Sequence, residues 1–411
     1  MKIRSVQPVL LSYPFPEPIR LPYHGGERTL FKRDAMVIRV ETDQGLIGYA
    51  PGEGSVHARD IVSNLIAPFL IDKTIGDPDA LRVMFARSVG AESYAMKVWC
   101  SVEIGLYDLL GQARGIPVSE MITGRVRDRI RLYGSAGMYM SPEEYAREAE
   151  AVAELGFRAY KMRPALGPEE DVRTVRLMRE SVGGAFDLMV DAHTWWRMGD
   201  RSYSYETVER VASEIAEFDI AWLEEPLPPH DHQAYKRLRD AALVPLASGE
   251  HEPDEDRYLD LILTGAVDYV QMDVVCQGGY PTGRRIMPEI ARENLRFAFH
   301  SFGTALEVVA AAHLGICWPE SVVEWLEYPC YSTPGRVGMY PFPLAAEILT
   351  EPLEIDTGDL VVSRAPGLGV RVDERVFDRY PWIEGPWSSF STSSPPETRM
   401  VTGDHSAAWG R

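Results

Sequence analysis

Between residues 129 and 328, eight short apolar runs alternate with longer amphipathic segments. Each run has the length and composition of a buried parallel strand, and each segment between them repeats its apolar residues at helical spacing. Eight strand–helix repeats are typical of a TIM barrel. After the eighth run no clear helix follows, and the chain enters Pro- and Gly-rich sequence. The runs are RIRLYGSAG, RAYKMR, DLMVDAH, IAWLEEP, VPLASGE, YVQMDVV, RFAFHS and VVEWLEY.

The chain before residue 129 follows a different pattern. The stretch AMVIRVETDQGLIGYAPGE alternates apolar and polar residues and breaks at Asp43-Gln44-Gly45, which predicts a β-hairpin. Residues 60–124 show helical spacing, and their last long run ends at Gly115 before Pro117. We therefore predict an α+β domain at residues 1–128, a barrel at 129–340, and a segment at 341–411 that returns to the first domain and carries an arm from residue 381.

Carboxylates end three successive barrel runs, at Asp191, Glu224 and Glu250. Their spacings, 33 residues (224 − 191) and 26 residues (250 − 224), match one strand, one helix and two loops. The three side chains should then meet on one face of the barrel. Oxygen ligands of this kind favour a hard cation, and Mg²⁺ is the ion we expect. A single such residue is more often a helix cap or a surface charge, so the prediction of a metal site depends on the three residues taken together. Glu225 directly follows Glu224, and the sequence leaves open which of these two side chains points inward.

Other strand ends carry polar residues that suit proton transfer. Asp273 and His300 end neighbouring runs, and a carboxylate beside a histidine orients the imidazole and makes it a better base. Lys161 and Arg163 lie two residues apart on one strand, so their side chains point to the same side. The remaining candidates at these ends are His193 and Glu327.

Charge limits the classes of partner, and cysteine usage indicates the cellular compartment. The 42 basic and 61 acidic side chains give a net charge of −19, which disfavours nucleic acid and anionic membranes. The four cysteines, Cys100, Cys276, Cys317 and Cys330, show no CxxC pairing and are expected to be free thiols of a reducing compartment. The first residues contain no apolar signal region and no stretch resembles a membrane span. We expect a soluble, cytoplasmic protein.

The chain resembles the mandelate racemase subgroup of the enolase superfamily over essentially its whole length. The resemblance rests on KMR at 161–163, VDAH at 190–193, WLEEP at 222–226, SGE at 248–250, Asp273, FHS at 299–301 and WLE at 325–327. The segments WLEEPLPPHDHQAYKRLR and SGEHE are similar to those of rhamnonate dehydratases. The resemblance implies an α+β capping domain over a modified (β/α)7β barrel, which explains the missing last helix. It also implies Mg²⁺ held by Asp191, Glu224 and Glu250, a small carboxylate substrate bound to it, and a homo-oligomer, dimeric or octameric.

The shared reaction of that superfamily is removal of the proton next to a carboxylate, and Asp273–His300 matches the family's base. Racemases of the subgroup carry Lys-x-Lys, whereas this chain has Arg163 at the second position. A guanidinium stays protonated and is a poor base. A one-base route therefore fits better: His300 takes the α-proton, His193 or His300 itself expels the β-hydroxyl, and a 2-keto-3-deoxy acid forms. Glu327, at the end of the eighth run, could donate or accept a hydrogen bond on the opposite side of the site.

We therefore expect an acid-sugar dehydratase, a hydro-lyase acting on aldonates or aldarates. One alternative is a racemase or epimerase of a 2-hydroxy acid with Lys161 as second base, and another is a catalytically idle scaffold. Loops at 20–30 and 53–59 would shape specificity, with Tyr23, His24 and His57 as candidate substrate contacts. Trp195 could line the mouth of the site or belong to the core. Four other histidines are expected to be structural or supporting, with the last one packed and neutral: His230, His232, His251 and His313.

Overall fold

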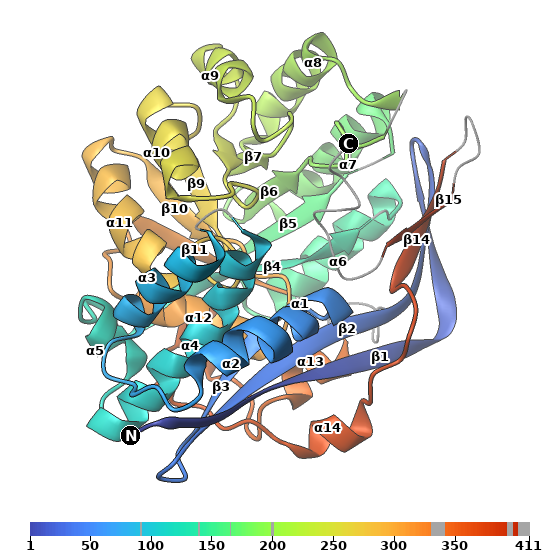
Figure 1. The fold of residues 1–411 in the computed structure, drawn as a ribbon. Helices are drawn as coiled ribbons and strands as arrows, with labels where there is room; N and C mark the ends of the chain where they lie inside the picture. Colours follow the sequence, from blue (N-terminus) through green and yellow to red (C-terminus); the bar gives the residue numbers. More distant parts are fainter. Residues whose placement is uncertain are drawn as a thin grey trace.

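The computed structural model describes residues 1–90, 93–138, 140–164, 166–198, 201–329, 342–392 and 398–401. Eight parallel strands follow one another in chain order, and the last pairs with the first to close a barrel (Figure 1). The predicted TIM barrel with an α+β cap is thereby confirmed. The barrel strands are β4 (Arg129–Met138), β5 (Ala159–Arg163), β6 (Asp187–Asp191), β7 (Trp222–Glu224), β8 (Leu246–Ser248), β9 (Tyr269–Met272), β10 (Arg296–Phe299) and β11 (Val323–Tyr328).

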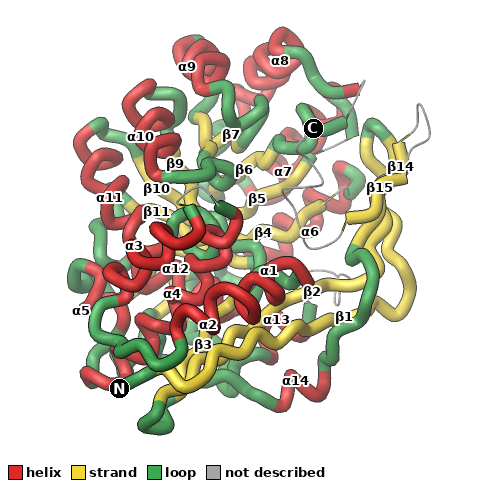
Figure 2. The backbone as a smooth tube through the Cα atoms, viewed as in Figure 1, coloured by secondary structure: helices red, strands yellow, loops and turns green. Residues whose placement is uncertain are grey.

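Helices connect consecutive barrel strands and enclose the barrel, as Figure 2 shows in red around yellow strands. Several begin at a residue whose side chain accepts a backbone N–H; Ser141 and Glu144 form a complete capping box. The segment after β11, expected to lack a helix, falls at residues 330–341, outside the described chain. The helices are α6 (Pro142–Glu154), α7 (Pro168–Val182), α8 (Tyr205–Ile215) with a 3-10 turn at Ala216–Phe218, α9 (His232–Asp240), α10 (Glu255–Thr264), α11 (Gly279–Arg292) and α12 (Ala305–Gly315).

The barrel interior contains a layer of alternating large and small apolar side chains. Tyr133 and Trp222 meet edge to face, with ring centroids 5.4 Å apart. The members of this layer are Tyr133, Ala159, Met189, Trp222, Ala247, Ala298 and Trp325. Most lie two residues before a residue singled out above, for example Ala298 before His300. Because side chains on a strand alternate with period two, the polar residues form the next interior layer toward the carboxyl ends.

The cap is an antiparallel sheet covered by helices. Its β1 (Ile3–Tyr23) and β2 (Gly26–Thr42) form a long hairpin, and β3 (Ile47–Gly52) follows the turn at residues 43–46, where the sequence predicts it. Helix α4 packs closely on this sheet because Gly48 and Gly105 meet: a Cβ on Gly48 would lie 2.6 Å from the Gly105 carbonyl oxygen. The cap helices are α1 (Val56–Ile61), the π-helical turn Val62–Ile66, α2 (Ala67–Leu70), α3 (Pro78–Val89), α4 (Tyr94–Arg114) and α5 (Val118–Ile122).

The C-terminal segment contacts both parts of the molecule. Strand β14 (Ser388–Thr392) pairs with β2 of the cap and with β15 (Thr398–Val401). In contrast, β12 (Ile355–Asp356) and β13 (Asp359–Val361) extend the barrel sheet, because β13 pairs with β4. The segment at 341–411, predicted to return to the first domain, thus supplies strands to both sheets. Strand β4 begins at Arg129, five residues before its first partner on β5 (134 − 129), and β13 pairs with this overhanging part.

Short helices α13 (Pro343–Glu347) and α14 (Arg375–Arg379) complete the segment. The domain boundaries at 128 and 340 remain predictions, and residue 340 lies outside the described chain. Cys100, Cys276 and Cys317 are free, whereas Cys330 is not described. Within the described ranges, no helix combines the length and apolar character needed to cross a membrane.

Candidate active site

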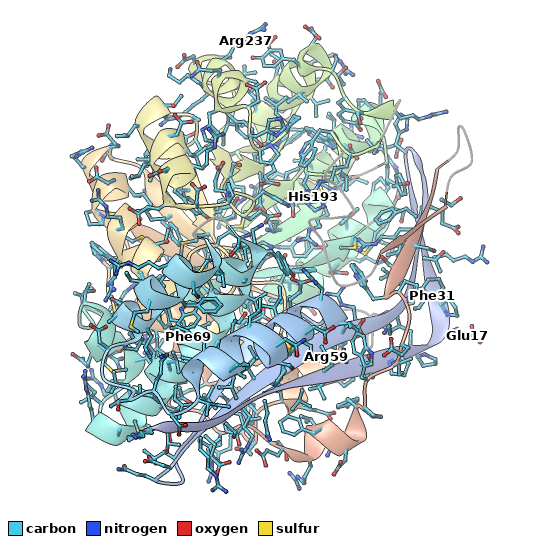
Figure 3. All side chains as sticks on the ribbon, viewed as in Figure 1. Glu17, Phe31, Arg59, Phe69, His193 and Arg237 are labelled. Atoms are coloured by element: carbon cyan, nitrogen blue, oxygen red, sulfur yellow. The ribbon has the colours of Figure 1, made fainter. Side chains whose placement is uncertain are left out.

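The predicted site residues lie at the carboxyl ends of the barrel strands. Figure 3 labels His193 near the middle of the molecule, between Arg237 of the barrel helices and Arg59 of the cap. Asp191 and Glu224 are direct partners in the β6–β7 ladder. Lys161 Nζ lies 2.6 Å from Glu224 Oε1 and 3.7 Å from Asp191 Oδ2, and all three side chains are fully buried. The structure therefore brings two predicted metal ligands together around a lysine.

Lys161 also reaches across the barrel, where its Nζ lies 3.1 Å from Glu327 Oε1. Burial alone would lower the pKa of Lys161, but Glu224 and Glu327 outweigh it and hold the pKa well above its ordinary value. Glu327 is held in turn by the Ser135 hydroxyl, which donates at 2.5 Å, and by the Ser301 backbone N–H at 3.0 Å. This side of the site is a fully buried network of paired charges.

Arg163 occupies the position next to Lys161 on the inward side of β5. Its Nε donates to Asp191 Oδ2 at 2.6 Å, and its guanidinium carbon lies 4.0 Å from the ring centroid of Phe302. Burial would lower the pKa of Arg163, yet the attraction of Asp191 raises it. This arrangement is consistent with a cation that holds negative charge and does not take protons.

His193 lies against the second oxygen of Asp191. Its Nδ1 is 2.7 Å from Asp191 Oδ1, and 13% of its side chain is exposed. Burial lowers the pKa of His193 to about 4, although the Asp191 charge opposes this. Asp191 itself sits among His193, Arg163 and Lys161, and these outweigh its burial and hold its pKa well below the ordinary value.

His300 occupies the opposite side of the barrel mouth. Its Nδ1 lies 3.0 Å from Asp273 Oδ2, so the predicted pair is in contact. Its Nε2 lies 3.1 Å from Glu250 Oε2 and 3.8 Å from Glu327 Oε2. Burial would lower the pKa of His300, but Glu250 and Glu327 raise it to about 10. The Val275 N–H fixes Asp273 by donating to its Oδ1 at 2.8 Å.

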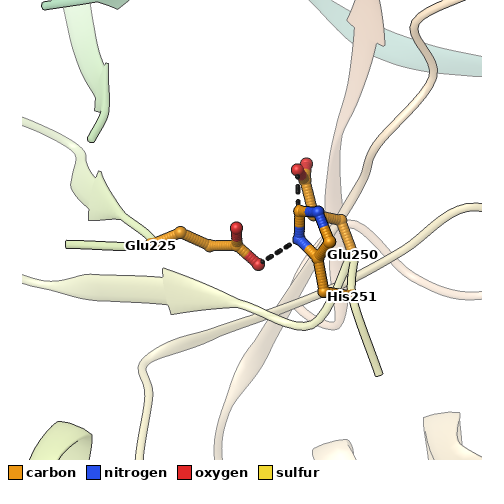
Figure 4. Close-up of side chains that lie close together, drawn as sticks. All are labelled: Glu225, Glu250 and His251. Atoms are coloured by element: carbon orange, nitrogen blue, oxygen red, sulfur yellow. Dashed lines mark hydrogen bonds and ion pairs between the residues drawn. The ribbon is translucent and has the colours of Figure 1, made fainter. Parts of the chain in front are cut away.

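The three predicted metal ligands do not converge as one tight group. Among the described residues, the three potential ligands within 4.8 Å of one another are Glu225, Glu250 and His251 (Figure 4). Asp191 and Glu224 are instead drawn toward Lys161. The buried Glu250 Oε2 accepts no hydrogen bond from the described chain, and His300 is near it without hydrogen-bond alignment. The unpaired Glu250 Oε2, together with the nearby carboxylates of Asp191 and Glu224, fits the oxygen ligands of a hard divalent cation.

Glu225 and His251 are the site residues that the sequence reasoning did not select. Glu225 has φ +43°, a left-handed conformation that turns its side chain away from that of Glu224. It is fully buried and its Oε1 lies 2.9 Å from His251 Nδ1. The open question about the Glu224–Glu225 pair is thus answered: Glu224 points to Lys161 and Glu225 to His251. The sequence analysis expected only a structural or supporting role for His251; its adjacency to Glu250 is the signal that could have indicated its place in the site.

The predicted substrate contacts lie in different settings. Tyr23 ends β1 and packs edge-on against Phe390. His24, at the hairpin tip, lies 6.5 Å from the ring of Tyr203, so the cap reaches the barrel loops here. His57 lies on helix α1, where the sequence suggests a loop, because Ser55 caps that helix one residue before it begins.

Trp195 belongs to the core. It is 1% exposed, and its Nε1 donates to Asp171 Oδ2 at 2.9 Å. Its ring also stacks on Tyr203. Of the two settings open for this residue, the structure favours the core.

Comparison with known proteins shows the family to which this chain belongs. Residues 144–376 match the enolase C-terminal domain-like family, and residues 12–123 match the N-terminal domain of mandelate racemase / muconate lactonizing enzyme. The chain belongs to this family of the enolase superfamily and is an enzyme, as its sequence motifs predict.

Named relatives span nearly the whole chain. The chain is 25% identical over 395 residues to D-galactarolactone cycloisomerase of Agrobacterium fabrum, covering 91% of this chain and 97% of that one. It is 28% identical over 370 residues to L-rhamnonate dehydratase of Saccharopolyspora erythraea, covering 84% and 85%. A solved enolase-superfamily member from Polaromonas sp. JS666 has a TM-score of 0.80 at 28% identity, over 94% of this chain and 99% of that one.

Proposed function

We propose that this enzyme is a Mg²⁺-dependent dehydratase of sugar acids. It would remove the proton on the carbon next to a carboxylate and the hydroxyl on the following carbon, releasing water. The enol that remains tautomerises to a 2-keto-3-deoxy acid. The observation that carries the proposal is the placement of His300, oriented by Asp273, opposite Lys161 and Arg163 across a group of carboxylates. The relatives named L-rhamnonate dehydratase and D-galactarolactone cycloisomerase support it.

Asp191, Glu224 and Glu250 would hold the cation. When bound, Mg²⁺ neutralises the oxygens of the substrate carboxylate as negative charge develops on them. Lys161 and Arg163 add two fixed positive charges at the same oxygens, and both are already positioned by carboxylates. A preorganised charge in a water-excluded site stabilises a transition state more than the same charge in water.

His300 would be the base. Asp273 accepts the N–H at Nδ1. A cation held by Glu250 would offset the charge that raises the pKa of His300, and Nε2 would then be the atom that takes the α-proton. A positioned general base contributes about 10²–10⁴-fold to the rate. The acid for the leaving hydroxyl would be His193 or His300 after it has gained the proton. A racemase would need a second base on the other face. Lys161 is surrounded by carboxylates there, and Arg163 is a poor proton acceptor.

The proposal is tested by incubating a panel of aldonates and aldarates with the enzyme and Mg²⁺ in D₂O and following them by NMR. A 2-keto product from one acid supports dehydration and identifies the substrate. Deuterium at the α-carbon with inversion and no keto product would make the enzyme an epimerase. Lack of Mg²⁺ binding by isothermal titration calorimetry, together with unchanged acids, would support an idle scaffold instead.

A further inference from the structure

His251 lies between two buried carboxylates (Figure 4). Its Nδ1 is 2.9 Å from Glu225 Oε1 and 3.4 Å from Glu250 Oε1. These are the Oε1 atoms of both residues, and Glu250 Oε2 faces His300 instead. A hydrogen on Nδ1 would therefore bond to Glu225 and place its positive end beside the Oε1 edge of Glu250, while Oε2 stays on the side of His300.

Arg197 decides where the hydrogen of His251 resides. Its Nη2 lies 2.8 Å from His251 Nε2. A guanidinium only donates hydrogen bonds, so Nε2 must accept, and the ring carries its hydrogen on Nδ1. The N–H of His251 then points at Glu225, which accepts it, and Glu250 Oε1 lies 3.4 Å from the same nitrogen.

The surrounding backbone fixes this arrangement. Glu225 adopts φ +43°, a strained conformation for a non-glycine residue that persists only where its neighbours determine it. Trp196 Nε1 donates to the Glu225 carbonyl oxygen at 3.0 Å, and Arg197 lies 4.2 Å over the Trp196 ring. The loop that follows Asp191 therefore holds both Glu225 and the orientation of His251.

We propose that His251, oriented by Arg197, is a positioning residue that sets Glu250 for metal binding. The inference rests on the proposed function, since it takes Glu250 as a ligand of Mg²⁺. It links the loop after one ligand, Asp191, to a second ligand on a different strand. Partners that orient ligating carboxylates typically change metal affinity by about 10–100-fold when they are removed.

The same three side chains could instead bind a cation directly, and the hydrogen positions argue against this. A metal at Nδ1 needs a lone pair there, so the hydrogen would have to move to Nε2. In that position it would face the Arg197 guanidinium, another donor, at 2.8 Å. Arg197 Nη2 and His251 Nε2 can form a hydrogen bond only when the hydrogen of the ring is on Nδ1.

The test measures binding of Mg²⁺ by calorimetry and of Mn²⁺ by electron paramagnetic resonance, without substrate. His251→Leu removes the donor, and we expect about 10–100-fold weaker binding of both ions. His251→Asn keeps an amide N–H near the Nδ1 position and should bind within about threefold of the unaltered enzyme. Arg201→Met, in the same region but exposed and outside the site, is the matched control and should bind normally.

Two further variants separate the alternatives. If His251 positions Glu250, then Asp191→Asn abolishes binding, whereas Glu225→Gln, which retains an acceptor for His251, has little effect. The reverse pattern would overturn the proposal and make Glu225, Glu250 and His251 the cation site. Equal affinity of His251→Leu and the unaltered enzyme would also overturn it. Failure of the unaltered enzyme to bind either ion would instead refute the metal-dependent function itself.

Nitrogen-15 NMR of histidine-labelled enzyme reads the hydrogen position directly, because protonated and unprotonated ring nitrogens differ widely in chemical shift. His251→Asn assigns the signal by its loss. We expect a hydrogen on Nδ1 and none on Nε2 in the unaltered enzyme. The opposite tautomer would contradict the role given to Arg197.

Discussion

The two sides of the active-site mouth hold their carboxylates by different means. On the β5–β7 side, Lys161 and Arg163 contact Asp191 and Glu224 in a buried network, with His193 at its edge on the second oxygen of Asp191. On the β8–β10 side, imidazoles face the carboxylates, and they are more open: 17% of the His300 side chain and 34% of the His251 side chain are exposed. Permanent cations supply fixed charge, whereas imidazoles can transfer protons at ordinary pH.

This difference indicates a division of labour. A buried charge that loses its partner is strongly destabilising, so the β5–β7 side should respond to substitution with loss of both stability and charge stabilisation. The β8–β10 side lies nearer to solvent and carries the proposed base, His300, so it should respond mainly in rate and in metal affinity. The predictions below test this division.

The largest effect is expected for His300→Asn. The variant keeps a polar side chain beside Asp273 but removes the proton acceptor, and kcat for dehydration should fall by about 10⁴-fold, equivalent to about 5.5 kcal/mol. Steady-state kinetics with the acid found in the NMR screen measure this. Mg²⁺ affinity should change little, because His300 is not a proposed ligand.

His232→Asn is the matched control for this variant. His232 is also held between two carboxylates, at 2.7 Å from Glu252 and 2.6 Å from Asp260, but it lies outside the proposed machinery. Its kcat should stay close to that of the unaltered enzyme. Dehydration by His300→Asn within tenfold of normal would remove His300 as the base.

The positions of the acid–base residues were accessible from sequence because they depend on local signals. A strand that ends in a polar residue marks the carboxyl end of a barrel, and period two places Lys161, Asp191 and His300 on the inner side. The eight barrel strands were predicted for the same reason. Each combines a short apolar run with turn residues, and no long-range information is needed to find it.

Interactions set by loop conformation were not accessible. The role of Glu225 depends on one left-handed φ angle, and the tautomer of His251 depends on Arg197 from a distant strand–helix loop. Likewise, β13 pairs with β4 only because β4 overhangs its neighbour, a property of register in the folded barrel. The burial of Trp195 follows from Asp171, which is 24 residues away.

Lys161→Met tests the charged side through stability. Removing a buried cation leaves Asp191, Glu224 and Glu327 facing one another, and the free energy of unfolding should fall by about 3–5 kcal/mol. Denaturant unfolding in the presence of a chelator measures it, and added Mg²⁺ should restore part of the loss. The control Lys236→Met breaks an exposed pair with Asp240 and should change stability by less than about 1 kcal/mol. An equally small change for Lys161→Met would contradict the view that the β5–β7 side depends on buried fixed charges for its stability.

A buried imidazole that no carboxylate contacts should behave in the opposite way to one among carboxylates; for His313, burial acts first and the charge of Arg125 acts in the same direction. His313 contacts the Leu368 carbonyl oxygen at 3.0 Å and the Ser119 N–H at 3.3 Å, and burial lowers its pKa to about 4. The unfolded chain binds a proton near pH 6.5, before the folded chain does. Stability is therefore full above pH 6.5 and falls as the pH drops toward 4, by up to about 3 kcal/mol.

The His313→Asn variant should lose this part of the pH dependence. Thermal unfolding midpoints measured between pH 7.5 and pH 4.5 show whether its slope is shallower than that of the unaltered enzyme. His230→Asn, an exposed histidine, should keep the original slope. Identical slopes for His313→Asn and the unaltered enzyme would mean that the proton uptake occurs elsewhere.

The smallest effect is expected for Arg163→Lys, which keeps the charge and changes its geometry. Lysine cannot reproduce the flat stack on Phe302 at 4.0 Å together with the Nε hydrogen bond to Asp191, so kcat/KM should fall by about 10–100-fold. Unlike guanidinium, an amine can accept a proton, so the ratio of α-deuterium exchange to dehydration should rise in D₂O. The control Arg131→Lys alters a similar stack, 5.5 Å over Trp325, at the amino end of the barrel and should leave that ratio unchanged. If Arg163→Lys raised dehydration while Arg163→Ala left it untouched, Arg163 would not hold substrate charge, and the fixed-cation side would reduce to Lys161 alone.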